Sequence, residues 1–100
     1  MVLLRSVFQA KFGKASDVVA EFKKMTQLFT EDQVKSLQVR ILTDISGPFD
    51  TVVMETTHAS LAALEQFRNA MFAMPEMSQD ASTTNDLIES GRNEYYTIEV

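Results

Sequence analysis

The chain has 100 residues, 45% of them hydrophobic and 23% charged, and its formal net charge is -5 at pH 7. This composition is typical of a single globular domain. Its nine lysines and arginines are scattered along the chain, which argues against nucleic acid and anionic membranes as partners. The absence of cysteine excludes disulfides, thiolate catalysis and cysteine-based metal or iron–sulfur sites.

No stretch of the sequence has the pattern of a targeting signal, and none approaches the roughly 20 apolar residues that cross a bilayer. We therefore expect a cytoplasmic protein without membrane contact. A chain this short buries only a small core, so an exposed sheet face would be a liability. We expect a homodimer that covers such a face.

The chain is predicted to begin with a strand and a helix. Residues 2–11 alternate between a drier and a wetter set of side chains, which is the period of a strand. Gly13 then interrupts the pattern, and Ser16 or Asp17 can cap or charge-stabilise the start of a helix. Apolar residues at helical spacing predict that this helix runs to about Phe29.

A second strand and a hairpin follow. Thr30 and Gln33 have the spacing of a capping box, but we interpret the polar segment around them as a connection. Residues 36–45 alternate again and predict a strand. Ser-Gly-Pro at 46–48 is a turn signal, so residues 49–57 are expected to return as an antiparallel strand.

The last part of the chain predicts a helix and a closing strand. Ser60 is the expected N-cap of a helix that Pro75 interrupts. Further helix, including Met77, Ala81, Leu87 and Ile88, is predicted before Gly91, which is interpreted as a helix stop. Residues 94–100 are the predicted final strand. The order β-α-β-β-α-β indicates an α+β ferredoxin-like sandwich, a four-stranded antiparallel sheet with both helices on one face.

The alternation also predicts which side chains share a sheet face. Apolar side chains are assigned to the helix side: Leu4, Phe8, Val39, Ile41, Val52, Met54, Ile98 and Val100. The opposite face then has polar and charged side chains among apolar ones: Arg5, Gln9, Gln38, Arg40, Glu55, Tyr95 and Glu99. Such a mixed face suits a surface that a second subunit covers, provided that each buried charge is paired.

Two interpretations of this mixed face stay open. In the first, its arginines and glutamates form structural pairs across strands or between subunits. In the second, Arg5, Arg40, Glu55 and Tyr95 line a cavity between two sheets and bind a substrate. Arg5 and Arg40 would then grip an anionic or polar molecule, and Tyr95 would donate a hydrogen bond.

Other candidate functional residues give weaker signals. His58 is the only histidine, and its position suggests a solvated junction between strand and helix. A single imidazole without cysteine makes a zinc site improbable, so no metal is expected. Met71 and Met74 fit core filling better than an adaptable ligand pocket. The chain shows no motif that assigns catalytic residues.

Several short segments resemble a known family. They are SGPFDTVVME at 46–55, SLAALE at 60–65 and MPE at 74–76, with Gly-Lys at 13–14 before the first helix. Together they resemble the second half of NIPSNAP-like proteins of the dimeric α/β-barrel superfamily, although the polar segment 30–35 has no recognisable family motif. The resemblance implies a ferredoxin-like protomer that pairs through its sheet into a closed barrel.

The resemblance leaves the function open, because superfamily members include cofactor-free monooxygenases, haem-degrading enzymes, isomerases and uncharacterised proteins. A protein that binds or transforms a small organic molecule without a cofactor is one hypothesis. Haem degradation ranks lower, since His58 is the only strong axial-ligand candidate. The alternative is a non-catalytic dimerisation or regulatory module.

Overall fold

The computed structural model describes residues 1–76 and 84–100 and contains one four-stranded antiparallel sheet. The elements in chain order are β1 (Val2–Ala10), α1 (Ala15–Thr26), α2 (Glu31–Leu37), β2 (Arg40–Thr43), β3 (Thr51–His58), α3 (Leu61–Phe72) and β4 (Ile88–Thr97). The strand order is β2-β3-β1-β4, so β1 and β3 lie in the centre. The predicted α+β ferredoxin-like arrangement is confirmed.

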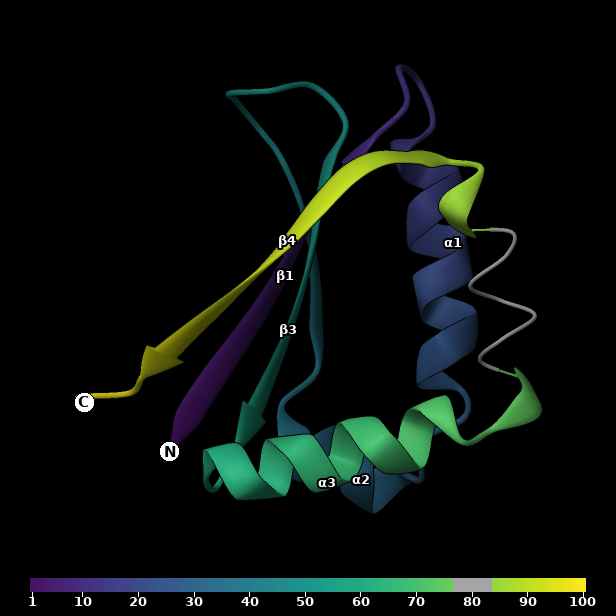
Figure 1. The fold of residues 1–100 in the computed structure, drawn as a ribbon. Helices are drawn as coiled ribbons and strands as arrows, with labels where there is room; N and C mark the ends of the chain where they lie inside the picture. Colours follow the sequence, from purple (N-terminus) through teal and green to yellow (C-terminus); the bar gives the residue numbers. More distant parts are fainter. Residues whose placement is uncertain (77–83) are drawn as a thin grey trace.

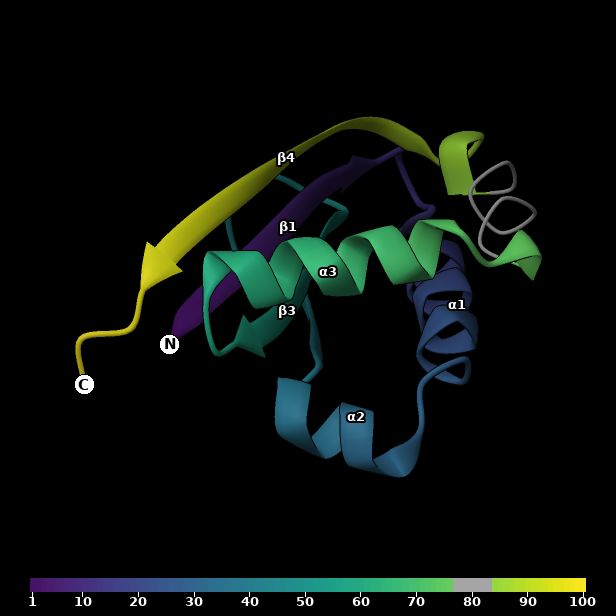
Figure 2. The same cartoon turned by 60° about the horizontal axis from the view of Figure 1, so that its bottom comes forward.

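The helices α1 and α3 lie on the same side of the sheet, and the two chain ends lie near one another (Figure 1). Figure 2 shows α3 running across the strands, with α1 near the C-terminal end of α3 and α2 set apart from both at the bottom of the view. Within the described ranges, no helix has the length and apolarity needed to cross a membrane.

The core lies between the sheet and α1. Val18 and Phe22 on α1 pack against Ala10 and Val52 from the two central strands. The ring of Phe8 joins them at 5.1 Å from the ring of Phe22. The helical spacing of the α1 residues and the alternation of the strand residues both place their side chains on this side, as the sequence predicts.

The start of α1 depends on a residue distant in sequence. Neither Ser16 nor Asp17 caps the helix, because the N-cap position is Lys14 and the capping carboxylate comes from Asp50. Asp17 does lie in the first turn, where its negative charge favours the helix start, as predicted. Its Oδ2 accepts a hydrogen bond from the backbone N–H of Gly13 at 2.9 Å. Asp50 precedes β3, so this contact joins the two central strands to the helix start. The helix ends at Thr26, before the predicted Phe29.

The segment predicted as a connection is the helix α2. Thr30 Oγ1 accepts from the Gln33 N–H at 3.1 Å, and Gln33 Oε1 accepts from the Thr30 N–H at 2.9 Å. These reciprocal bonds satisfy two otherwise unpaired donors, which stabilises even a short, exposed helix. The helix ends at Gln38, whose φ is 50°. The predicted strand over 36–45 is therefore wrong at both ends and shortens to β2.

The last strand begins earlier than predicted. Gly91 is a residue of β4 and not a helix stop. It pairs with Phe8, and a Cβ built on Gly91 would lie 2.8 Å from Cδ1 of that ring. The glycine is needed because the aromatic side chain of the neighbouring strand crosses over it. Met77 and Ala81, predicted as helical, lie outside the described residues. By contrast, Ser60 is the N-cap of α3, as predicted, and accepts from the Ala63 N–H at 3.1 Å.

Candidate functional site

A cavity of about 440 Å³ lies between the sheet and the helices α1 and α3. Aromatic rings and methionines form much of its wall, among them Phe8, Phe22, Phe29, Met54, Phe67 and Met71. A few polar side chains also reach it, including Ser6, Thr56, His58, Arg68 and Asn93. An apolar cavity of this size with a few convergent polar groups is the usual form of a small-molecule site.

His58 is the titratable group buried deepest in this wall. It is 4% exposed, and its Nε2 lies 2.8 Å from Thr56 Oγ1. The ring centroids of His58 and Phe67 are 5.5 Å apart. Burial disfavours the charged imidazolium and lowers the pKa of His58 below its usual 6.5. The imidazole is therefore neutral at pH 7 and able to accept a proton.

The sequence placed His58 at a solvated junction, and this expectation is wrong. It is the last residue of β3, and it lines the same cavity as Met54 and Thr56. Met54, Thr56 and His58 are spaced two residues apart, and alternate residues of a strand share a face. This spacing could have predicted that His58 faces the helices. The strand simply continues one residue further than the predicted 49–57.

The sheet and α3 contribute further polar groups to the cavity. Ser6 Oγ donates to Asn93 Oδ1 at 2.8 Å across the β1–β4 pair. On α3, Arg68 Nη2 donates to the hydroxyl of Tyr95 at 2.8 Å. Both contacts join residues far apart in sequence, so sequence patterns could not indicate them.

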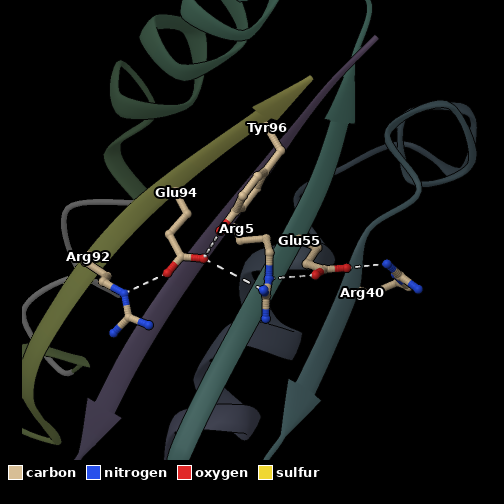
Figure 3. Close-up of polar contacts among 6 residues, drawn as sticks. All are labelled: Arg5, Arg40, Glu55, Arg92, Glu94 and Tyr96. Carbon is tan, nitrogen blue, oxygen red and sulfur yellow. Dashed lines mark hydrogen bonds and ion pairs between the residues drawn. The ribbon is translucent and has the colours of Figure 1, made fainter. Parts of the chain in front are cut away.

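The candidate residues Arg5, Arg40 and Glu55 lie together on the opposite face of the sheet (Figure 3). Arg5 Nε lies 3.0 Å from Glu55 Oε2, and Arg40 pairs with the other carboxylate oxygen of Glu55. Glu94 continues the row at 3.7 Å from Arg5 Nη1. Alternating charges on neighbouring strands neutralise one another, as expected of structural cross-strand pairs.

Two more residues complete this charged row, which we call the Glu55–Glu94 network. Arg92 Nε donates to Glu94 Oε2 at 2.8 Å, and the Tyr96 hydroxyl donates to Glu94 Oε1 at 2.9 Å (Figure 3). The hydrogen bonds from Arg92 and then from Tyr96 lower the pKa of Glu94. The same contact with Glu94 raises the pKa of Tyr96.

Tyr95, the fourth candidate, does not belong to this face. It pairs with Leu4, so it lies on the helix side of the sheet and contacts Arg68. Ile98, which was predicted on the helix side, lies beyond the end of β4 at Thr97. Tyr95 and Tyr96 are the same residue type, so the sequence does not indicate which of them faces the helices. The pairing of β4 with β1 decides this instead.

Metal binding has no support in the part of the chain that the structure describes. Those residues contain no group of three or more histidine, aspartate or glutamate side chains arranged to hold an ion. The cavity's own donors are one imidazole, hydroxyls, amides and a guanidinium, which suit an organic ligand better than a metal.

The buried imidazole predicts a specific pH dependence of stability. The unfolded chain takes up a proton near pH 6.5, but the folded chain resists this, so the free energy of unfolding should fall as pH drops below 6.5. The contribution of one group is at most about 1.4 kcal/mol per pH unit. It stops growing below the folded-state pKa.

This prediction can be checked directly, because His58 gives the only histidine resonance in an NMR titration. Urea unfolding of the wild type and of His58→Gln over the same pH range separates its effect from that of the carboxylates. A His58 resonance that titrates at or above 6.5 would contradict the burial of this ring.

Solved structures of NIPSNAP proteins and of proteins proposed to be antibiotic biosynthesis monooxygenases share this fold. A NIPSNAP family protein from Agrobacterium tumefaciens has a TM-score of 0.80 at 16% identity, covering 96% of this chain and 90% of that chain. An uncharacterised NIPSNAP domain protein from Burkholderia xenovorans has a TM-score of 0.75 at 15% identity, and the match covers 98% of this chain and 94% of that chain. A protein from Deinococcus radiodurans that is proposed to be an antibiotic biosynthesis monooxygenase has a TM-score of 0.72 at 17% identity. The match covers 100% of this chain and 94% of that chain.

No protein-family model matches the sequence, and no curated protein matches it. At sequence identities this low, structural similarity shows a shared fold and no more. The predicted resemblance to NIPSNAP-like proteins is confirmed at the level of the fold. Function must be argued from the cavity.

Proposed function

We propose that this protein binds a small organic molecule in the cavity between its sheet and helices and transforms it by proton transfer without a cofactor. The observation that carries the proposal is a neutral, buried His58 in the wall of an apolar cavity of about 440 Å³. A base that is unprotonated at pH 7 and shielded from water is suited to remove a weakly acidic proton.

The contact between His58 and Thr56 suggests how the base is held. If Nε2–H donates to Thr56 Oγ1 across the 2.8 Å separation, Nδ1 retains the lone pair that accepts a proton. Removal of a proton from the carbon beside a carbonyl yields an enolate, and removal of the hydroxyl proton of a phenol yields a phenolate. Return of the proton at another carbon completes an isomerisation.

A monooxygenase reaction is the other outcome of the same first step. The carbanion form of the substrate adds dioxygen, and protonation gives a hydroperoxide. Loss of water from the hydroperoxide leaves a carbonyl, so the substrate supplies all the electrons. The solved structures with this fold include proteins proposed to be antibiotic biosynthesis monooxygenases, which supports this outcome by analogy alone.

We also propose that residues 1–100 form one dimeric α/β-barrel domain and that two protomers pair through the sheet faces that bear the Glu55–Glu94 network. The described residues on this face include half-exposed apolar and aromatic side chains, with Leu42 37% and Tyr96 47% exposed. A partner would cover them. A cytoplasmic location stays a prediction from the sequence.

The proton-transfer proposal can be tested with acetonaphthone, an enolisable aryl ketone of suitable shape. Wild-type protein should accelerate exchange of the ketone's α-protons in D₂O, followed by proton NMR. His58→Gln should reduce this acceleration by roughly 10²- to 10⁴-fold, the range of general base catalysis. Lys14→Ala, an exposed change outside the cavity wall, is the matched control.

Binding is measured in the same samples from backbone amide shifts. Shifts at Met54, Thr56 and neighbouring cavity residues support the site. If acetonaphthone binds there but His58→Gln exchanges its protons as fast as wild type, the base assignment is wrong. If no cavity residue shifts, the proposed ligand site is wrong.

A second candidate function is a non-catalytic dimerisation module. It is favoured by Arg5, Arg40 and Arg92, which all pair with glutamates of the sheet face and leave no cation there for a ligand among the described residues. Native mass spectrometry of the purified protein separates the two functions. A dimer with a retained small molecule supports the ligand-binding function. A bare dimer that also does not bind acetonaphthone supports the non-catalytic dimerisation module.

A further inference from the structure

Arg68 places a positive charge in the wall of a mostly apolar cavity. It lies on α3, is half-buried, and lines the cavity together with Leu64, Phe67 and Met71 of the same helix. Its Nη2 donates to the Tyr95 hydroxyl at 2.8 Å. That hydroxyl orients the guanidinium but adds no negative charge to balance it.

This arginine is unlike the others in the chain. Arg5, Arg40 and Arg92 each form an ion pair with a glutamate. Within residues 1–76 and 84–100, Arg68 forms none. Glu65 lies one helical turn before it, at a spacing that often pairs, yet it is exposed, and the ion pairs among the described residues do not include one between Glu65 and Arg68.

A shortage of acidic residues does not explain why Arg68 has no acidic partner among the described residues, because the chain has 14 acidic residues and nine basic ones. A half-buried cation beside apolar walls is costly unless an anion or several hydrogen bonds compensate it. The guanidinium has five N–H donors, and the described residues accept from one of its nitrogens.

We propose that the cavity takes an organic monocarboxylate with an apolar, aromatic body, and that Arg68 grips its carboxylate. This inference rests on the proposed ligand site and adds the charge class of the ligand. A guanidinium binds a carboxylate through two parallel N–H···O bonds, and Tyr95 acts as a positioning residue that holds the guanidinium plane. The rings and methionines of the wall then enclose the body.

In one of the two interpretations of the sequence, Arg5 and Arg40 grip an anion on the opposite sheet face. The geometry moves this role to Arg68, because the charges of Arg5 and Arg40 are already neutralised by Glu55. Tyr95 was predicted to donate a hydrogen bond to the ligand, whereas its hydroxyl accepts one from Arg68 on the helix side of the sheet.

Two probes of the same shape isolate the charge. Naphthoate carries a carboxylate, and acetonaphthone replaces it with a neutral acetyl group. Affinities of both are measured by amide shift titration at pH 7.5 for wild type, Arg68→Gln, Arg68→Lys and Tyr95→Phe. Arg92→Gln is the control, since it removes the same charge outside the cavity wall.

We expect wild type to bind naphthoate more tightly than acetonaphthone. Arg68→Gln should weaken naphthoate roughly 10- to 100-fold, the usual effect of losing a charge-assisted hydrogen-bond pair. It should leave acetonaphthone within about 2-fold, which also shows that the variant is folded. Arg68→Lys should recover part of the loss, and Tyr95→Phe should weaken naphthoate by a smaller factor.

The outcomes separate this inference from the proposed function. If acetonaphthone binds in the cavity and naphthoate shows no preference, or none that Arg68→Gln removes, the carboxylate assignment is wrong and the site stands. If Arg68→Gln weakens both probes equally, Arg68 is structural. If neither probe shifts a cavity residue, both the inference and the site are wrong.

Discussion

Replacing Phe22 with alanine is expected to lower the free energy of unfolding by about 3 to 5 kcal/mol, the usual cost of deleting a buried aromatic ring. Phe22 is 3% exposed and joins α1 to both central strands. It also lines the cavity, so the space left by the ring merges with an existing void and cannot easily collapse.

Urea unfolding at pH 7.5, followed by circular dichroism, measures this loss. A domain of this size has a total stability of about 5 to 15 kcal/mol, so the variant should lie near the limit of folding. Phe12→Ala is the matched control, because Phe12 is 85% exposed and should change stability by less than about 0.5 kcal/mol. Equal effects of the two changes would contradict the packing of α1 on the sheet.

Replacing Glu55 with glutamine is expected to cost about 1 to 3 kcal/mol, although the side chain keeps its shape. Glu55 is 5% exposed and is the shared partner of Arg5 and Arg40. Its neutral amide leaves two cations without this carboxylate, and Arg5 keeps only the longer contact to Glu94 at 3.7 Å. The Glu55 side chain is 7% exposed, whereas those of Arg5 and Arg40 are 35% and 64% exposed. High salt should therefore screen the Arg40 contact more than the Arg5 contact and reduce part of the loss.

A double-mutant cycle tests this interpretation. Arg40→Gln combined with Glu55→Gln should destabilise less than the sum of the two single changes, since Arg40→Gln removes a cation that Glu55→Gln leaves without its carboxylate. Glu94→Gln should cost clearly less than Glu55→Gln, because Glu94 lies on the edge strand and is more exposed. Additive single changes would show that Arg40 and Glu55 do not interact in solution.

Local patterns predicted the two central strands and both main helices well. Strand alternation is read from neighbouring residues, so β1 differs from its predicted range only at Lys11. The helix start at Ser60 was also correct, since a serine before an apolar helical stripe is a local signal. The errors lie where local signals conflict, as in α2, where a short capping box competes with an alternating run that begins at Ser36.

Other errors lie where a residue's role depends on a distant partner. The start of α1 is capped by Asp50, 37 positions away from Gly13. Gly91 was interpreted as a helix stop because glycine is common there, whereas its lack of a side chain accommodates Phe8. No pattern near either residue could reveal these contacts.

The sequence by itself determined the class of fold, because hydrophobic periodicity and turn residues specify the β-α-β-β-α-β order and the side that each central strand turns toward the helices. It also brought Arg5, Arg40 and Glu55 to one face, since their strand phases are set by clear alternation. Only the tertiary structure decided that these charges neutralise one another, that His58 is buried, and that Arg68 lacks an acidic partner among the described residues. Those properties depend on strand register and on helix-to-sheet contacts between residues that are distant in sequence, and local sequence patterns do not reveal such contacts.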